Sequence, residues 1–267
     1  MPPLLLSAAI TPLRDGGASL DLDAVGPLWE YLRAGGADGV FCCGTTGEGV
    51  LLTHEERQAL AIAFREACDG RLIVHAGAQT TAGTAALANH AASIGADGVA
   101  VIPPPYYPLD DDALVEHMCT AAAACEPLPF YLYAFAARSG YPLGVDVVRR
   151  VQERASNVAG LKVSESPFSA IRPYLELDLP VLVGSEPLIP EALAAGAAGS
   201  VSGLASAFPQ TVRAALDDPG ERTAAPLRAL RDRLGAASFI AGLKHELGLA
   251  GVPVRGDMRA PLRPWAD

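Results

Sequence analysis

The sequence predicts an α/β fold: a (β/α)₈ TIM barrel formed by residues 1–220, followed by a short C-terminal helical appendage at residues 221–267. Three observations lead to this prediction. Eight short apolar runs alternate with amphipathic segments, one glycine-containing joint occurs three times, and strand-like runs stop near residue 220. Eight strand–helix units in about 205 residues fit the roughly 200–250 residues that such a barrel needs.

The apolar runs are predicted to be the barrel strands. They are short and dominated by apolar residues, which is typical of parallel strands that are buried on both faces. In chain order they are residues 4–10, 39–43, 72–76, 98–102, 130–135, 158–163, 180–183 and 199–204.

The segments between these runs carry helix signals. Apolar residues recur at helical spacing in residues 22–32 and 60–68. Thr53-His54-Glu55-Glu56 is a capping box that opens the second of these helices. Residues 110–112 are all aspartate, which predicts another helix start because the helix dipole favours negative charge there.

The repeated joint predicts how helices lead into strands. Residues 36–40, Gly-Ala-Asp-Gly-Val, recur at residues 95–99 and more loosely at residues 196–200. Each copy indicates a helix that ends at a glycine, followed by a tight turn into a strand. A doubly wound open sheet is the second choice of fold, weakened because no G-x-G-x-x-G motif follows the first strand. Beyond residue 220, two further amphipathic patterns predict two helices, centred on residues 227–234 and 239–243.

Composition limits the possible functions. Half of the 267 residues are hydrophobic and the formal net charge is -10, which argues against a nucleic-acid partner but permits a small anionic substrate. The five cysteines match no zinc spacing and are expected to be buried thiols in a reducing, cytoplasmic setting. The N-terminus lacks the positive region of a signal peptide, and the uncharged stretches at residues 72–96 and 192–212 are not expected to span a membrane.

The basic residues comprise 18 arginines and only two lysines, Lys162 and Lys244. Lys162 lies within an apolar run, where burial would lower its pKa and leave an amine able to form a Schiff base with a carbonyl. The alternative is a lysine at a strand end that reaches solvent or pairs with Glu165. Lys244, beside His245 and Glu246, is expected on the solvated face of an amphipathic helix.

Residues directly after the predicted strands should surround the active site of such a barrel. Residues 44–47, Gly-Thr-Thr-Gly, can turn tightly and present backbone N–H groups and hydroxyls to a carboxylate or phosphate, or can be an ordinary loop. Tyr133 shares one strand face with Tyr131 and is suited either to proton transfer or to packing. Arg138 is a candidate carboxylate clamp or a surface arginine.

Two further observations concern partners. Tyr106 and Tyr107 follow three prolines and are expected to form a rigid loop at a subunit interface. The five histidines show no metal-ligand spacing, so no metal site is predicted.

The order of these motifs is more specific than any one of them. Residues 44–48, then Tyr106 and Tyr107, then Tyr133 with Arg138-Ser139-Gly140, then Gly160-Leu161-Lys162, resemble the dihydrodipicolinate synthase / N-acetylneuraminate lyase family. Residues 11–13 near the start and 259–262 near the end look like its terminal signatures, so the resemblance covers nearly the whole chain.

The resemblance implies a class I pyruvate-dependent lyase without metal or organic cofactor, assembled as a homotetramer from tight dimers. Lys162 would form the Schiff base with pyruvate. The Gly44, Thr45 and Thr46 segment would hold the pyruvate carboxylate. Tyr133, hydrogen-bonded to Thr45 and to Tyr107 from the neighbouring subunit, would relay protons.

The resemblance also implies a pocket for the second substrate, an aldehyde. Its predicted residues are Arg138, Gly184, Glu186 and Val201. Arg138 matches an arginine of the synthase branch and favours a 4-hydroxy-tetrahydrodipicolinate synthase-like condensation.

The sequence departs from the family pattern at three positions near this pocket, Ala134, Ala136 and Val163, and carries Gly184-Ser185-Glu186 where Gly-Asp-Asp is usual. These departures keep three alternatives open: a 2-keto-3-deoxy sugar acid aldolase, an N-acetylneuraminate lyase-like enzyme, and a non-catalytic keto-acid-binding relative.

Overall fold

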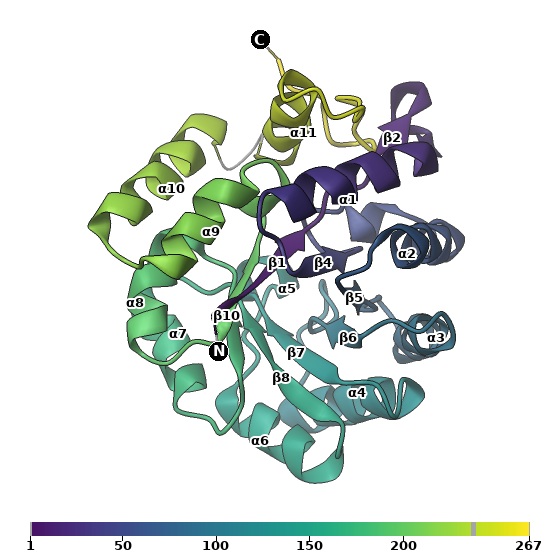
Figure 1. Ribbon diagram of the computed structural model, residues 1–267. Helices are drawn as coiled ribbons and strands as arrows, with labels where there is room; N and C mark the ends of the chain where they lie inside the picture. Colours follow the sequence, from purple (N-terminus) through teal and green to yellow (C-terminus); the bar gives the residue numbers. More distant parts are fainter. Residues whose placement is uncertain (1, 236–238, 267) are drawn as a thin grey trace.

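The eight predicted strands form a closed parallel barrel (Figure 1). The computed structural model describes residues 2–235 and 239–266. β1 pairs with both β4 and β10, which closes the sheet and excludes the open, doubly wound alternative. The barrel strands are β1 (Leu4–Ala8), β4 (Gly39–Cys42), β5 (Arg71–His75), β6 (Gly98–Val101), β7 (Phe130–Ala134), β8 (Val158–Val163), β9 (Val181–Val183) and β10 (Gly199–Ser202).

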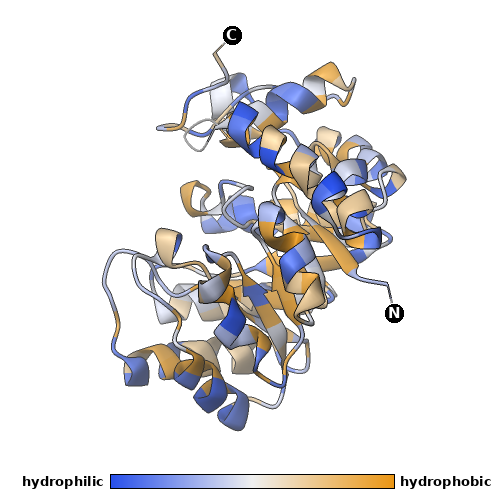
Figure 2. Cartoon of the chain, turned by 90° about the vertical axis from the view of Figure 1, so that its left-hand side faces the viewer, coloured by the Kyte–Doolittle hydropathy of each residue, from blue (hydrophilic) through white to orange (hydrophobic). Residues whose placement is uncertain are grey.

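The barrel has two separate apolar cores. The larger fills the space between the strands and the surrounding helices, and the smaller fills the barrel interior with residues such as Leu6, Phe41 and Tyr133. Hydrophobic strands therefore occupy the centre in Figure 2, while hydrophilic residues lie on the outer helices. In register, Tyr133 of β7 pairs with Lys162 of β8, which pairs with Leu182 of β9.

A helix follows each barrel strand before the next strand begins, as predicted. The capping box is present: the Thr53 hydroxyl accepts from the Glu56 amide at 3.2 Å, and the Glu56 carboxylate accepts from the Thr53 amide at 2.9 Å. Asp110 caps a further helix by accepting from the Ala113 amide at 2.8 Å. These helices are α1 (Val25–Ala34), α2 (His54–Ala67), α3 (Thr81–Ser93), α4 (Asp111–Ala124), α6 (Val145–Arg154), α7 (Phe168–Leu175), α8 (Ile189–Ala194) and α9 (Pro209–Asp217).

The repeated joint has the same left-handed backbone conformation at its first glycine in all three copies. Gly36, Gly95 and Gly196 have φ values of 89°, 70° and 99°, in the left-handed region that glycine adopts without steric cost. Each joint turns the chain from the end of a helix into the start of a strand. The joints therefore lie at the opposite end of the barrel from the carboxyl ends of the strands.

Several elements are added to the barrel. The first connection contains a short antiparallel hairpin, β2 (Leu13–Arg14) with β3 (Ser19–Leu20), and α5 (Ala136–Ser139) follows β7. In the described part of the chain, 3₁₀ turns cover Asp15–Gly17, Leu22–Ala24, Gly49–Leu51, Glu186–Leu188 and Leu204–Ser206. Within the described residues, none of the helices combines the length and the apolar character needed to cross a membrane.

The C-terminal appendage consists of α10 (Glu221–Leu234) and α11 (Phe239–Leu249), as the apolar spacing predicts. The chain after α11 lies beside the β2–β3 hairpin (Figure 1), where Arg255 lies 3.6 Å from a carboxylate oxygen of Asp21. The expectation that Lys244 of α11 faces solvent is wrong. Its side chain is fully buried, and its Nζ lies 2.6 Å from a carboxylate oxygen of Glu48 in the loop after β4.

Candidate active site

Lys162 stands inside the barrel near the end of β8 and is only 4% exposed. Its Nζ lies 4.0 Å from the ring centre of Phe41 and 4.1 Å from that of Tyr133. It neither reaches solvent nor pairs with Glu165, whose carboxylate instead accepts from the Ala136 amide at 2.8 Å. The amine therefore sits in an aromatic enclosure formed by strands β4 and β7.

The electrostatics of this position favour the neutral amine. Burial lowers the pKa of Lys162 from 10.5 to about 7, and the nearby carboxylate of Glu186 opposes this by raising it. The aromatic faces attract whatever ammonium form remains. A large share of the amine is thus unprotonated near neutral pH, which is the state that attacks a carbonyl.

Tyr133 is the second titratable group of the enclosure, and it is 1% exposed. Burial raises its pKa, while hydrogen bonding to the hydroxyls of Thr45 and Ser164 lowers it. Its pairing with Thr45 brings β7 and the loop after β4 together at the phenol. Ser164 was not predicted, although its place directly after strand β8 is a signal that could have identified it.

The loop after β4 faces this enclosure. Gly44 packs so closely on Phe41 that a Cβ there would lie 2.7 Å from the ring, so only glycine allows the loop this path. The loop is closed on itself, because the Glu48 amide donates to the Thr45 carbonyl and the Gly49 amide to the Gly44 carbonyl, each at 3.1 Å.

Three backbone N–H groups of this loop are left without an acceptor. Across residues 2–235 and 239–266, the amides of Thr45, Thr46 and Gly47 donate to no protein group. The Gly47 carbonyl is occupied, because it accepts from the Thr11 hydroxyl at 2.5 Å. Successive free amides of this kind form a concavity suited to an anion.

Glu186 is the acidic group that acts on Lys162, and it is 1% exposed. One of its carboxylate oxygens accepts from the Ser202 hydroxyl and the Leu204 amide, both at 2.9 Å. The other lies 3.8 Å from the guanidinium of Arg231 on α10. The side chain is therefore held in place by β10 and by the appendage.

The remaining predicted residues are placed as follows. Val201 belongs to the inner core of the barrel, and a Cβ at Gly184 would lie 2.0 Å from the Ser164 hydroxyl, so the backbone passes close to the site. Arg138 is exposed on α5, with its guanidinium 5.7 Å from the ring centre of Phe135. Its charge lowers the pKa of Tyr133, and it forms no ion pair with any described residue.

The two tyrosines of the proline-rich loop are not brought to Lys162 within the chain. Tyr106 and Tyr107 are 81% and 73% exposed, and their rings contact each other with centres 4.8 Å apart. Two adjacent exposed aromatic rings form a contiguous apolar surface, which is a feature of protein–protein contact sites.

Two of the departures from the family pattern lie outside the barrel interior. Ala134 and Val163 are register partners on β7 and β8, and both belong to the outer core between strands and helices. They therefore leave the interior unchanged. Ala136 starts α5 at the mouth of the barrel, where its amide donates to Glu165.

His75 is a site residue that was not singled out from the sequence. It ends β5 in the barrel interior, its ring centre lies 5.9 Å from that of Tyr133, and its Nδ1 lies 3.2 Å from the Cys43 carbonyl. Burial, together with the positive charges of Arg57 and Lys162, lowers its pKa well below the usual value, so the ring is neutral. Its spacing of two residues from Ile73, another inner residue, could have identified it.

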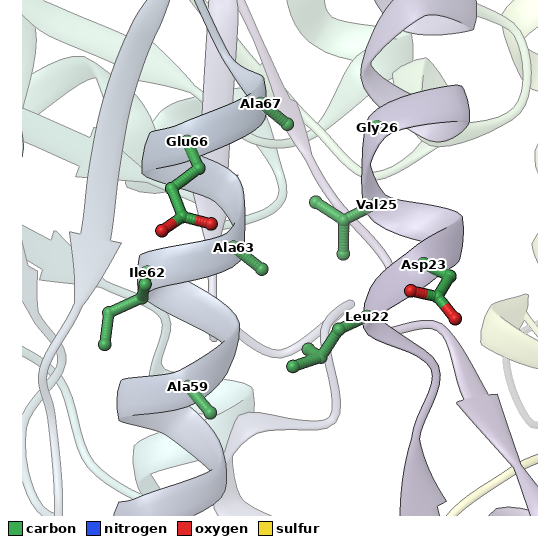
Figure 3. Close-up of a pocket in the computed structure, with 9 residues that line it drawn as sticks. All are labelled: Leu22, Asp23, Val25, Gly26, Ala59, Ile62, Ala63, Glu66 and Ala67. Atoms are coloured by element: carbon green, nitrogen blue, oxygen red, sulfur yellow. The ribbon is translucent and has the colours of Figure 1, made fainter.

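A separate hollow lies outside the barrel, between α1 and α2. Figure 3 shows the two helices side by side, with small or aliphatic side chains such as Val25 and Ala63 pointing into the space between them. Its charged residues are Asp23 and Glu66, and it holds no basic or nucleophilic group. It therefore offers nothing that recognises a keto acid. In the described part of the chain, His, Cys, Asp and Glu residues form no group of three that could hold a metal ion.

Comparison with known proteins agrees with this geometry. Residues 3–267 match the Dihydrodipicolinate synthetase family. A DapA-like lyase of Halobacterium salinarum is 36% identical over 279 residues, covering 99% of this chain and 91% of that protein. The 4-hydroxy-tetrahydrodipicolinate synthase 1 of Streptomyces coelicolor is 36% identical, covering 97% and 87%. The structure of Proteus mirabilis N-acetylneuraminate lyase superposes with a TM-score of 0.90 at 26% identity, covering 99% and 93%.

Proposed function

Because this chain belongs to the dihydrodipicolinate synthetase family and is a lyase of the aldolase type, we propose that Lys162 forms a Schiff base with the C2 carbonyl of pyruvate. The observation that carries the proposal is the Lys162 amine. It is buried, its pKa is lowered to about 7, and it lies beside the phenol of Tyr133. An amine that must attack a carbonyl needs to be unprotonated, and burial achieves this.

The loop after β4 supplies the complementary site for pyruvate. The free amides of Thr45, Thr46 and Gly47 would donate hydrogen bonds to the carboxylate, which leaves the C2 carbonyl facing Lys162. No metal is needed for this recognition, because the loop offers hydrogen-bond donors directed at the anion.

The reaction follows from these positions. The Lys162 amine adds to C2, and the resulting carbinolamine loses water to give a protonated imine. The imine draws electrons from C3, which loses a proton to give an enamine, and the enamine carbon attacks the carbonyl carbon of an aldehyde. Tyr133 is suited to move these protons in both directions, and hydrolysis of the imine returns the free amine.

The second substrate is proposed to be an aldehyde that carries a carboxylate, as in a 4-hydroxy-tetrahydrodipicolinate synthase-like condensation. Arg138 supports this, because it is exposed near Tyr133 and has no ion-pair partner among the described residues. A second candidate is the cleavage of a sugar acid, as in an N-acetylneuraminate lyase or a 2-keto-3-deoxy sugar acid aldolase. Glu186 supports it, because a buried carboxylate can accept from sugar hydroxyls.

We further infer a homo-oligomer, a dimer of dimers, in which Tyr107 enters the site of a neighbouring subunit. The exposure of Tyr106 and Tyr107 supports this inference, since a contact between copies would bury both rings. The test is the oligomeric mass of the wild-type chain and of Tyr107→Phe, combined with the activity of each. A monomeric, fully active wild-type protein would exclude it.

The Schiff base is tested by borohydride reduction in the presence of pyruvate, followed by intact-mass measurement and peptide mapping. We expect one reduced pyruvate per chain, attached at Lys162 and absent from Lys162→Ala. An adduct that persists in Lys162→Ala, or no adduct at all, would refute the proposal. With Schiff-base formation established, a screen of aspartate semialdehyde, glyceraldehyde and N-acetylmannosamine as partners for pyruvate distinguishes the two candidate reactions.

A further inference from the structure

A buried ion pair anchors the loop after β4, which is the loop proposed above to bind the pyruvate carboxylate. Glu48, the last residue of the loop, lies 2.6 Å from the Nζ of Lys244, and both side chains are 0% exposed. The two residues are 196 positions apart in the chain. The pair thus joins the barrel loop to α11 of the C-terminal appendage.

Each residue of this pair has one additional partner in the C-terminal segment. Lys244 also donates to the Asp257 carbonyl at 2.7 Å, and the second carboxylate oxygen of Glu48 accepts from the Arg259 amide at 2.8 Å. A buried ion pair gives little net stability, because desolvation offsets the attraction between the charges. The ion pair and the hydrogen bond from Arg259 do, however, hold the Glu48 carboxylate in one position.

The position of Glu48 determines the shape of the loop. Its backbone is left-handed, with φ of 55°, which is uncommon for a residue other than glycine. From there its amide returns to the Thr45 carbonyl, which closes the turn that leaves the Thr45, Thr46 and Gly47 amides free. A shift of Glu48 would therefore turn these donors away from the position proposed for the pyruvate carboxylate.

We propose that Lys244 and Glu48 are positioning residues that set the affinity for pyruvate, an inference that rests on the proposed function. They do not touch the substrate, and they act through the loop amides. Their charges have unequal effects. Loss of Lys244 leaves a buried negative charge behind an anion site, whereas loss of the Glu48 charge leaves a positive one.

The experiment measures half-saturation by pyruvate in borohydride trapping at pH 8, and kcat at saturating pyruvate, for folded protein. We expect Lys244→Met to raise the half-saturation concentration about tenfold, with a smaller effect on kcat. Glu48→Gln should raise it less than Lys244→Met does. The double variant, which is neutral like the wild type, should lie between the wild type and Lys244→Met, at least about threefold above the wild type.

Glu246→Gln is the matched control, because Glu246 also lies on α11 and pairs with Arg233, away from the loop. It should keep the wild-type half-saturation. Wild-type half-saturation in folded Lys244→Met would overturn the inference, as would equal effects of Lys244→Met and Glu246→Gln. If Lys244→Met does not fold, the double variant provides the test instead. A wild-type half-saturation concentration in the folded double variant would then overturn the inference. Failure of the wild type itself to form an adduct would instead refute the proposed function.

Discussion

The lowered pKa of Lys162 predicts how fast pyruvate is captured at each pH. An amine with a pKa of about 7 is about 90% neutral at pH 8, whereas a lysine with the ordinary value of 10.5 is about 0.3% neutral. Burial in the aromatic enclosure therefore increases the reactive amine about 300-fold at this pH. The rate of adduct formation should be flat above about pH 8 and fall about tenfold per unit below about pH 6.

The assay mixes enzyme with subsaturating pyruvate in buffers from pH 5 to 10, quenches with excess borohydride after short times, and measures the adduct by intact mass. Lys162→Ala provides the blank. We expect a single ionisation with its midpoint near pH 7. A rate that continues to rise through pH 9 would show that the amine is protonated in the site, and the electrostatic account of Lys162 would then be wrong.

Three further predictions follow from the same environment. Glu186→Gln keeps the hydrogen-bond acceptor but removes the charge that raises the pKa of Lys162, so the midpoint of the pH profile of pyruvate trapping should move to lower pH. Glu165→Gln is the control: the Glu165 charge is not among those that shift the pKa of Lys162, so the midpoint should stay unchanged. Lys162 is less protonated in the folded chain than in the unfolded chain between about pH 7 and 10.5, so its contribution to stability becomes more favourable as pH rises through this range. Lys162→Met should therefore raise the free energy of unfolding by about 4 kcal/mol at pH 7, and the gain should vanish above pH 10.5. Equal denaturation curves of the wild type and the variant at pH 7 would contradict this. Arg138→Ala should lower kcat/KM for a carboxylate-bearing aldehyde about tenfold while pyruvate trapping stays unchanged, and an equal loss in both would remove Arg138 from the aldehyde pocket.

The fold could be predicted because its signals are local. Gly36, Gly95 and Gly196 mark the joints within a few residues of each strand, and Thr53 with Glu56 marks a helix start. Each of these signals depends on neighbours in the sequence, so no knowledge of the tertiary structure was required.

The site could be predicted only in part. The apolar surroundings of Lys162 and the alternation that places Tyr133 on the inner face are properties of single strands, and the structure brings the two together. Strand alternation also places His75 and Phe41 on inner faces, but it does not show which inner residues line the site and which only pack. The partner of Lys244 could not be predicted, because an amphipathic helix does not specify which of its charged residues meets a loop 196 positions away. The partner of Tyr107 could not be predicted from one chain either, because the oligomer proposed above would place this ring against a second copy.

Both lysines of this chain are buried: Lys162 is 4% exposed and Lys244 is 0% exposed. The chain also contains 18 arginines, whose guanidinium groups are not amines. The folded protein therefore has no lysine amine on its surface for bifunctional amine cross-linkers or for enzymes that acetylate or ubiquitinate lysine. Cross-linking through lysine would miss subunit contacts, so assembly has to be measured by mass or sedimentation. Conversely, lysine acylation in the absence of pyruvate would report either opening of the fold or entry of the reagent into the barrel.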